Sequence, residues 1–435
     1  MDRLITACVQ QRMRLPNSID DYVGDLRRFM RIAEKKNARL IIFPELAGIM
    51  IAPTLLQDFR SSLLKRSDQS RRASASFWEK LSGPIYNGAA ALLRANFRNS
   101  VEALLEVAPD QLLDTYVDVF AGLAKEFGVT IVAPSCYLPD RLTKNIHNMA
   151  GVFGPNGEEL GFQAKVMVHP SSDELGQPGE SWEVVPTEVG RLGVILGSDV
   201  LYPEVGRLLA YQKADVLISQ AACVEPVQYN KVRSGMLARM QDNQLFGVSS
   251  FLVGPNELLG DRRSPFVGRS AVFAPQELTL RLNGIMVEMG NQRSEGVITA
   301  EWDFAELREL WHSSETPIRQ LPTDEKIQPL LGQLYERLQN LPFYRSQDEL
   351  LELPEQSSFN GSTLEAVTLT LDELPVVSSI SSRWPLPELP DLSDLPFEQT
   401  IDDTDLQTLV SQNTLIIGAD DETEELDALN DHGGK

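Results

Sequence analysis

The segment Arg191–Glu204 constrains the fold of this chain more than any other stretch. Its apolar run Leu192–Leu196 is typical of a strand that is buried on both faces, and the run stops at Gly197. Pro203 and Glu204 then favour the first turn of a helix, where a proline fits and a carboxylate meets the positive helix end. Enzymes often place a nucleophile at such a turn, because it lifts one side chain out of the sheet.

The rest of the chain repeats this alternation of buried strands and amphipathic helices. Apolar residues recur at helical spacing in 19–33, after a capping Asn17 or Ser18, and again in 112–127. Short β-rich runs lie around these helices, at Leu4–Val9, Arg39–Phe43, Val129–Ala133 and Val216–Ser219. Strands this apolar must be covered on both faces, so the sequence predicts an α/β fold.

Two polar residues directly follow predicted strands. Glu45 ends the run Phe43-Pro44-Glu45, and the carboxyl end of a strand is where α/β proteins build their sites. Lys165 follows a hairpin whose turn is Gly154-Pro-Asn-Gly157. Alone, Glu45 is more typical of a helix-capping or surface glutamate, and Lys165 of a solvated surface lysine. Their assignment to a site therefore depends on the motifs around them.

Taken in order, these segments resemble the motifs of the nitrilase superfamily, the carbon–nitrogen hydrolases. The resemblance covers about residues 4–312, without the stretch 53–110, and its agreement across several motifs supports one fold. It implies a four-layer αββα sandwich, with two sheets face to face and helices outside. The similar segments are Phe43–Glu45, Asn148–Gly157 with Lys165, Arg191–Glu204, Met236–Val248 and Gly268–Pro275.

The resemblance also implies a catalytic site. In the family, a glutamate takes the proton of a cysteine, the thiolate attacks an amide or nitrile carbon, and a lysine stabilises the oxyanion. The motifs assign the glutamate to Glu45 and the lysine to Lys165. The cysteine position, however, is Gly197, which has no side chain.

Further residues are expected near the substrate. The resemblance implies a second glutamate there; Glu174 is the best candidate, and Asp173 and Glu180 stay open. Asp199, which fits the nucleophile motif, is also expected to lie at the substrate.

Three groups could replace the thiol. Ser198 is adjacent, but successive strand residues point to opposite faces, and a hydroxyl is harder to deprotonate than a thiol. Cys223 ends the neighbouring strand, yet a lone buried thiol is usually inert. Water activated by Glu45 would react slowly, because loss of a nucleophile costs on the order of a millionfold in turnover.

We therefore expect a non-catalytic or repurposed member, which binds a small amide or carboxylate or acts as a scaffold. The alternative is an active amide or nitrile hydrolase that uses Ser198 or another nucleophile.

Charge divides the chain unevenly. The formal charge is −23, and residues 348–435 hold 21 acidic against 2 basic residues, which leaves the body nearly neutral. We expect a nitrilase-like domain at 1–320, with a helical insertion at about 53–110, then a helical extension at 321–347 and an acidic, largely disordered tail at 348–435. The basic residues of the insertion are typical of a solvated face, a lid or a dock for the tail, and the tail could bind a protein partner.

Several classes of function are excluded by composition. A nearly neutral body argues against nucleic-acid binding, and no apolar stretch reaches the roughly 20 residues of a membrane helix. The three cysteines are too few for a disulfide framework, and the four scattered histidines predict no metal site. Without a signal peptide we expect a cytoplasmic protein with no cofactor. The resemblance allows a homodimer, since family members commonly pair through their outer helices.

Overall fold

A computed structural model describes residues 2–56, 97–169, 174–258 and 261–316, together with 318–319, 327, 331–332, 335 and 414–416. Within the predicted insertion, it shows the helix α5 (Phe97–Val107). The greater part of that insertion, and nearly all of the predicted extension and tail, lie outside the described residues. The role of the basic residues in the insertion therefore stays a prediction, and so does the binding of a protein partner by the tail.

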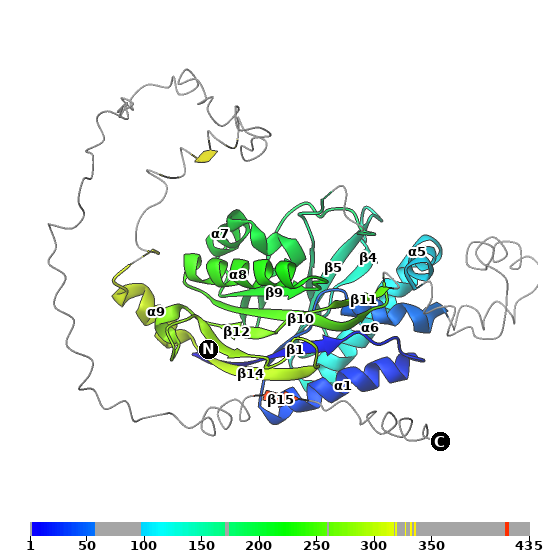
Figure 1. The fold of residues 1–435 in the computed structure, drawn as a ribbon, viewed down its shortest axis with the longest axis horizontal. Helices are drawn as coiled ribbons and strands as arrows, with labels where there is room; N and C mark the ends of the chain where they lie inside the picture. Colours follow the sequence, from blue (N-terminus) through cyan, green and yellow to red (C-terminus); the bar gives the residue numbers. More distant parts are fainter. Residues whose placement is uncertain are drawn as a thin grey trace, which may run out of the picture. The chain divides into compact units, whose positions relative to one another are not determined.

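The described strands form two β-sheets that pack face to face and are joined where β1 pairs with β10 (Figure 1). The first sheet runs β4–β5–β3–β2–β1–β14, with β6 beside β5 and β15 beside β14. Its strands are β1 (Arg3–Arg12), β2 (Leu40–Ile42), β3 (Thr130–Val132), β4 (Cys136–Pro139), β5 (Ile146–Phe153), β6 (Glu159–Ala164), β14 (Gly296–Asp303) and β15 (Thr414–Ile416).

The second sheet runs β7–β8–β9–β10–β12–β13, and β11 pairs with the far end of β10. Strands β8, β9 and β10 are parallel, so their carboxyl ends meet at one edge. Its strands are β7 (Val184–Thr187), β8 (Gly190–Leu196), β9 (Val216–Ala221), β10 (Phe246–Asn256), β11 (Asp261–Phe266), β12 (Ala271–Phe273) and β13 (Ile285–Glu288).

Alternate residues of the central strands enter different cores, as the two-residue repeat of a strand requires. In the first sheet, Leu40 and Ile42 pack between the sheets, whereas Ile41 faces the outer helices. In the second sheet, Ile218 lies between the sheets and Leu217 lies under the helices of the other side. This burial on both faces of both sheets confirms the predicted αββα sandwich.

The covering helices lie on opposite sides of the paired sheets (Figure 1). Over the first sheet lie α1 (Ile19–Lys35) and α6 (Pro109–Phe127), and over the second lie α7 (Pro203–Tyr211) and α8 (Pro226–Asn243); α9 (Phe304–Ser313) follows β14. As predicted, Ser18 caps α1, because its hydroxyl accepts the Asp21 amide at 3.1 Å. Gly128 ends α6 with a left-handed φ of 62°, a conformation that glycine adopts readily.

One buried side chain ties the two sheets together where several strands end. Gln220, the penultimate residue of β9, donates through Nε2 to the carbonyl oxygens of Phe43 at 2.7 Å and Ala133 at 2.8 Å. This contact fixes the carboxyl end of β9 to the ends of β2 and β3 in the facing sheet. Among the described residues, no helix combines the length and apolar character needed to cross a bilayer.

Candidate active site

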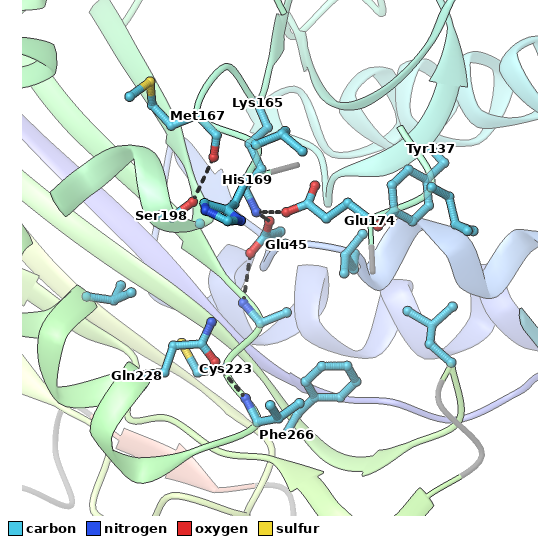
Figure 2. Close-up of a pocket in the computed structure, with 18 of the residues that line it drawn as sticks. Glu45, Tyr137, Lys165, Met167, His169, Glu174, Ser198, Cys223, Gln228 and Phe266 are labelled. Carbon is cyan, nitrogen blue, oxygen red and sulfur yellow. Dashed lines mark hydrogen bonds and ion pairs between the residues drawn. The ribbon is translucent and has the colours of Figure 1, made fainter. Parts of the chain in front are cut away.

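Glu45 is held by three different parts of the fold just beyond the end of β2 (Figure 2). Its Oε1 accepts from Asn148 Nδ2 on β5 at 3.0 Å and contacts Lys165 Nζ at 3.3 Å. Its Oε2 accepts from the backbone amide of Ala222, just after β9, at 3.0 Å. The side chain is therefore fixed in orientation and almost fully buried, with the residue only 3% exposed.

Lys165, just after β6, places one ammonium between two carboxylates (Figure 2). It is buried and forms ion pairs with both Glu45 and Glu174. Burial alone would lower the pKa of Lys165, but the two carboxylates outweigh it, so the pKa lies above its ordinary value.

The pKa of Glu45 is also raised, which looks inconsistent for two ion-pair partners. Burial is the main cause, and the like charge of Glu174 adds to it, so that together they outweigh the attraction of Lys165. The asymmetry has a simple origin: Lys165 faces two opposite charges, whereas Glu45 faces one opposite and one like charge. Glu45 therefore keeps its proton to a higher pH than an ordinary glutamate does.

Gly197 lies where β8 ends and the short 3-10 helix η2 (Gly197–Leu201) begins. Its φ is +51°, in the left-handed region that strains residues with a Cβ. A Cβ at this position would lie 2.8 Å from Glu45 Oε1 and 2.8 Å from Lys165 Nζ. A side chain on residue 197 would therefore point directly at both charged groups.

The neighbouring Ser198 has a different surrounding. It lies on the wall of the same cavity, but its hydroxyl donates to the carbonyl oxygen of Met167 at 3.0 Å (Figure 2). The proton of this hydroxyl is thus directed at the backbone. Cys223 also lines the cavity, and burial raises the pKa of its thiol well above the ordinary value.

Asp199, which we expected at the substrate, is not among the residues that line the cavity. Its carboxylate is fully buried and accepts from the amides of Val166 at 3.0 Å and Met167 at 2.8 Å, and from Trp182 Nε1 at 2.8 Å. These three donors turn the carboxylate toward the segment that follows Lys165, so Asp199 holds that segment in place.

The three acidic candidates for the second glutamate have different positions. Glu174 lines the cavity and pairs with Lys165. Glu180 is exposed and does not line the cavity, and Asp173 lies outside the described residues. Among the described candidates, the structure therefore brings only Glu174 to the lysine.

The cavity has a volume of about 650 Å³. Its wall includes Tyr137, a buried residue that sequence reasoning missed, and burial is the main cause of the raised pKa of its hydroxyl. Tyr137 lies opposite Asn148 in the β4–β5 ladder, so a correct prediction of β4 would have located it. In the described part of the chain, no group of His, Cys, Asp and Glu could hold a metal ion.

Comparison with known proteins agrees with this fold. The model of the carbon–nitrogen hydrolase family matches residues 5–311. The chain is 22% identical over 302 residues to the probable hydrolase YhcX of Bacillus subtilis, a match that covers 69% of this chain and 50% of that protein. It is 28% identical over 158 residues to an (R)-stereoselective amidase of a Pseudomonas species, which covers 36% of this chain and 53% of the amidase.

The chain thus spans about half the length of these two relatives. Among solved structures, a carbon–nitrogen hydrolase from Helicobacter pylori matches with a TM-score of 0.53 at 19% identity, over 76% of this chain and 98% of that chain. At this level of identity, the likeness shows a shared fold.

Proposed function

This chain belongs to the carbon–nitrogen hydrolase family, and from that premise we propose that it binds a small amide in a hydrolase-type site without hydrolysing it. Gly197 supports this proposal most directly. A Cβ on residue 197 would lie 2.8 Å from both Glu45 Oε1 and Lys165 Nζ, yet glycine supplies no side chain that could attack a substrate.

The charges of the site favour an amide over a carboxylate ligand. Glu45 and Glu174 surround the single ammonium of Lys165, so acidic groups outnumber the cation in this group. An amide can accept from Lys165 through its carbonyl oxygen and donate its N–H groups to the carboxylates. A carboxylate ligand has no such donor and would add a third negative charge.

The proposal is tested by restoring a thiol. Gly197→Cys should gain amidase turnover, measured as ammonia release, because its Sγ would start next to a carboxylate base and an ammonium. A Cβ at residue 197 carries the strain of the left-handed φ and crowds the ends of the Glu45 and Lys165 side chains, which must shift to accept it. Since loss of a nucleophile costs on the order of a millionfold, the unmodified protein should show no turnover above background.

Ser198→Cys is the matched control, because it adds a thiol one residue away, where the present hydroxyl faces the Met167 carbonyl. It should gain nothing. A folded Gly197→Cys variant that binds amides but stays inactive would show that the rest of the site no longer supports hydrolysis.

The second candidate is an active hydrolase that uses Ser198 or Cys223. Both residues line the cavity, which favours this alternative. The bonded hydroxyl of Ser198 and the raised thiol pKa of Cys223 weigh against it. Mass spectrometry after incubation with a panel of amides and nitriles separates the two functions, since an acyl adduct on either residue would overturn the non-catalytic proposal.

A further inference from the structure

We propose that the amide bound here carries an uncharged apolar chain, and that this chain lies against a wall formed by Val224, Val232, Leu258 and Phe266. We call this wall the apolar end of the cavity. The inference rests on the proposed function, because it describes the part of the ligand that lies beyond the amide head.

The cavity differs chemically on the two sides of the Ala222 amide that holds Glu45 (Figure 2). Glu45, Lys165 and Glu174 lie together on one side of this amide, while Cys223, Gln228 and Phe266 lie on the other. A ligand head paired with Lys165 would therefore direct the rest of the molecule toward Phe266 or toward the mouth of the cavity.

The residues of the apolar end come from separate elements and are already buried by the fold. Phe266 on β11 is 3% exposed, Leu258 just beyond β10 is 8% exposed, and Val232 on α8 is 2% exposed. Val224, just after β9, is half-buried. Side chains held in this way offer a ligand a preformed apolar surface, and burial of each ligand methylene against it is favourable.

The size of the cavity also exceeds what a bare amide head needs. At about 650 Å³, it lies within the range of about 300–1,000 Å³ that is typical of sites for drug-sized ligands. A two-carbon amide would leave most of this space to water.

Charge selects the kind of chain. The charged side chains that line the cavity include Lys165 and its two carboxylate partners, and Arg98, which pairs with Glu102 at 3.0 Å. None of the four residues of the apolar end can pair with a charge. Gln228, which lines the cavity beside them, is uncharged, and its Oε1 already accepts from the Val224 amide at 3.2 Å. A charged chain placed there would lose hydration without an ion-pair partner among these five residues, so the fitting chain is an alkyl or aryl group.

The test is a series of straight-chain amides, namely acetamide, butanamide and hexanamide, titrated into the full-length protein by calorimetry or NMR. Affinity should rise along the series by about fourfold in Kd per methylene, which corresponds to full burial of each group. Equal affinity for acetamide and hexanamide would overturn the apolar-end inference while leaving amide binding intact. Absence of binding by every amide would instead overturn the proposed function.

A substitution in the wall tests whether the ligand chain lies against it. Val224→Phe should fill the apolar end, so that hexanamide binds no better than acetamide, while acetamide binding stays unchanged. Val227→Phe is the matched control: it makes the same substitution three residues later, at a side chain that is 58% exposed and outside the cavity. If both variants reduce hexanamide binding equally, or neither does, the chain does not lie against this wall. The thermal midpoint of each variant checks its folding.

Discussion

Lys165 is the buried cation on which two acidic side chains of the cavity depend. A buried charge is costly when it lacks a partner, so removing one member of such a group typically costs about 3–5 kcal/mol. Here the group is unequal, with two carboxylates for one ammonium. Burial, with the like charge of Glu174 added to it, explains why the pKa of Glu45 rises in spite of its ion pair.

The raised pKa of Glu45 gives stability a defined pH dependence. The folded state keeps the Glu45 proton to a higher pH than the unfolded chain does, so this stabilisation is present below the ordinary pKa and is lost as pH rises through the folded pKa. Glu45→Gln removes the titration. As pH rises from the ordinary pKa of a glutamate through the raised pKa of Glu45, the free energy of unfolding of this variant should therefore rise relative to that of the unmodified protein.

Urea denaturation at several pH values measures this difference, and a constant packing cost of the substitution does not affect its slope. Glu180→Gln, at an exposed position outside the cavity, serves as the control and should leave the profile unchanged. A relative change in the opposite direction would mean that Lys165 outweighs burial and that the pKa of Glu45 is lowered.

At the scale of secondary-structure elements, the turn from β8 through η2 into α7 performs two tasks. Gly197 faces the charged groups of the cavity, and Asp199 binds the backbone that follows β6. The same turn therefore orients both the empty nucleophile position and the segment that carries Lys165.

Loss of the Asp199 carboxylate should loosen that segment. Asp199→Ala leaves the amides of Val166 and Met167 without their acceptor, and each unsatisfied buried donor costs about 1–3 kcal/mol. Hydrogen exchange at these two amides should become faster, and the free energy of unfolding should fall.

Asp303→Ala is the comparison variant, because Asp303 also accepts two backbone amides, at the start of α9. Because Asp303 also pairs with Arg3 at 2.9 Å, the effect of this variant should stay at the start of α9 and the beginning of β1, away from residues 166 and 167. Unchanged exchange at residues 166 and 167 in Asp199→Ala would show that other contacts hold this segment.

At the scale of the whole molecule, the edge of the first sheet is formed by a short strand that is remote in sequence. β15 pairs with β14 in an antiparallel ladder in which Gly296 lies opposite Ile416. β14 pairs on its other side with β1. Residues within the acidic part of the chain thus cover a backbone edge that would otherwise be open to pairing with other chains.

A pair of truncations tests this role. A chain ending at Asp403 lacks β15, so amides of β14 at residues 296–298 should exchange faster and self-association should increase. A chain ending at Gly418 keeps β15 and should behave like the full-length protein. Identical exchange and identical sedimentation in both truncations would contradict a protective role for β15.

The sequence by itself determined the strands and helices and, through its resemblance to the family motifs, the positions of the main charged groups. Apolar runs and helical periodicity are local, so the strands around Leu40 and Ile218 and the helix after Ser18 could be predicted from neighbouring residues alone. Glu45 and Lys165 each directly follow a strand, but their assignment, like that of the four layers, depended on the family motifs around them.

Only the tertiary structure decided how those groups meet. The choice of Glu174 over Glu180 follows from the ion pair of Glu174 with Lys165, and Asp199 is held by three donors from other segments instead of lining the cavity. Tyr137 lines the cavity because it lies opposite Asn148 in the β4–β5 ladder, and the sequence pattern did not predict β4. Such contacts join residues far apart in the chain, and their geometry follows from the packing of whole sheets, which no short stretch of sequence encodes.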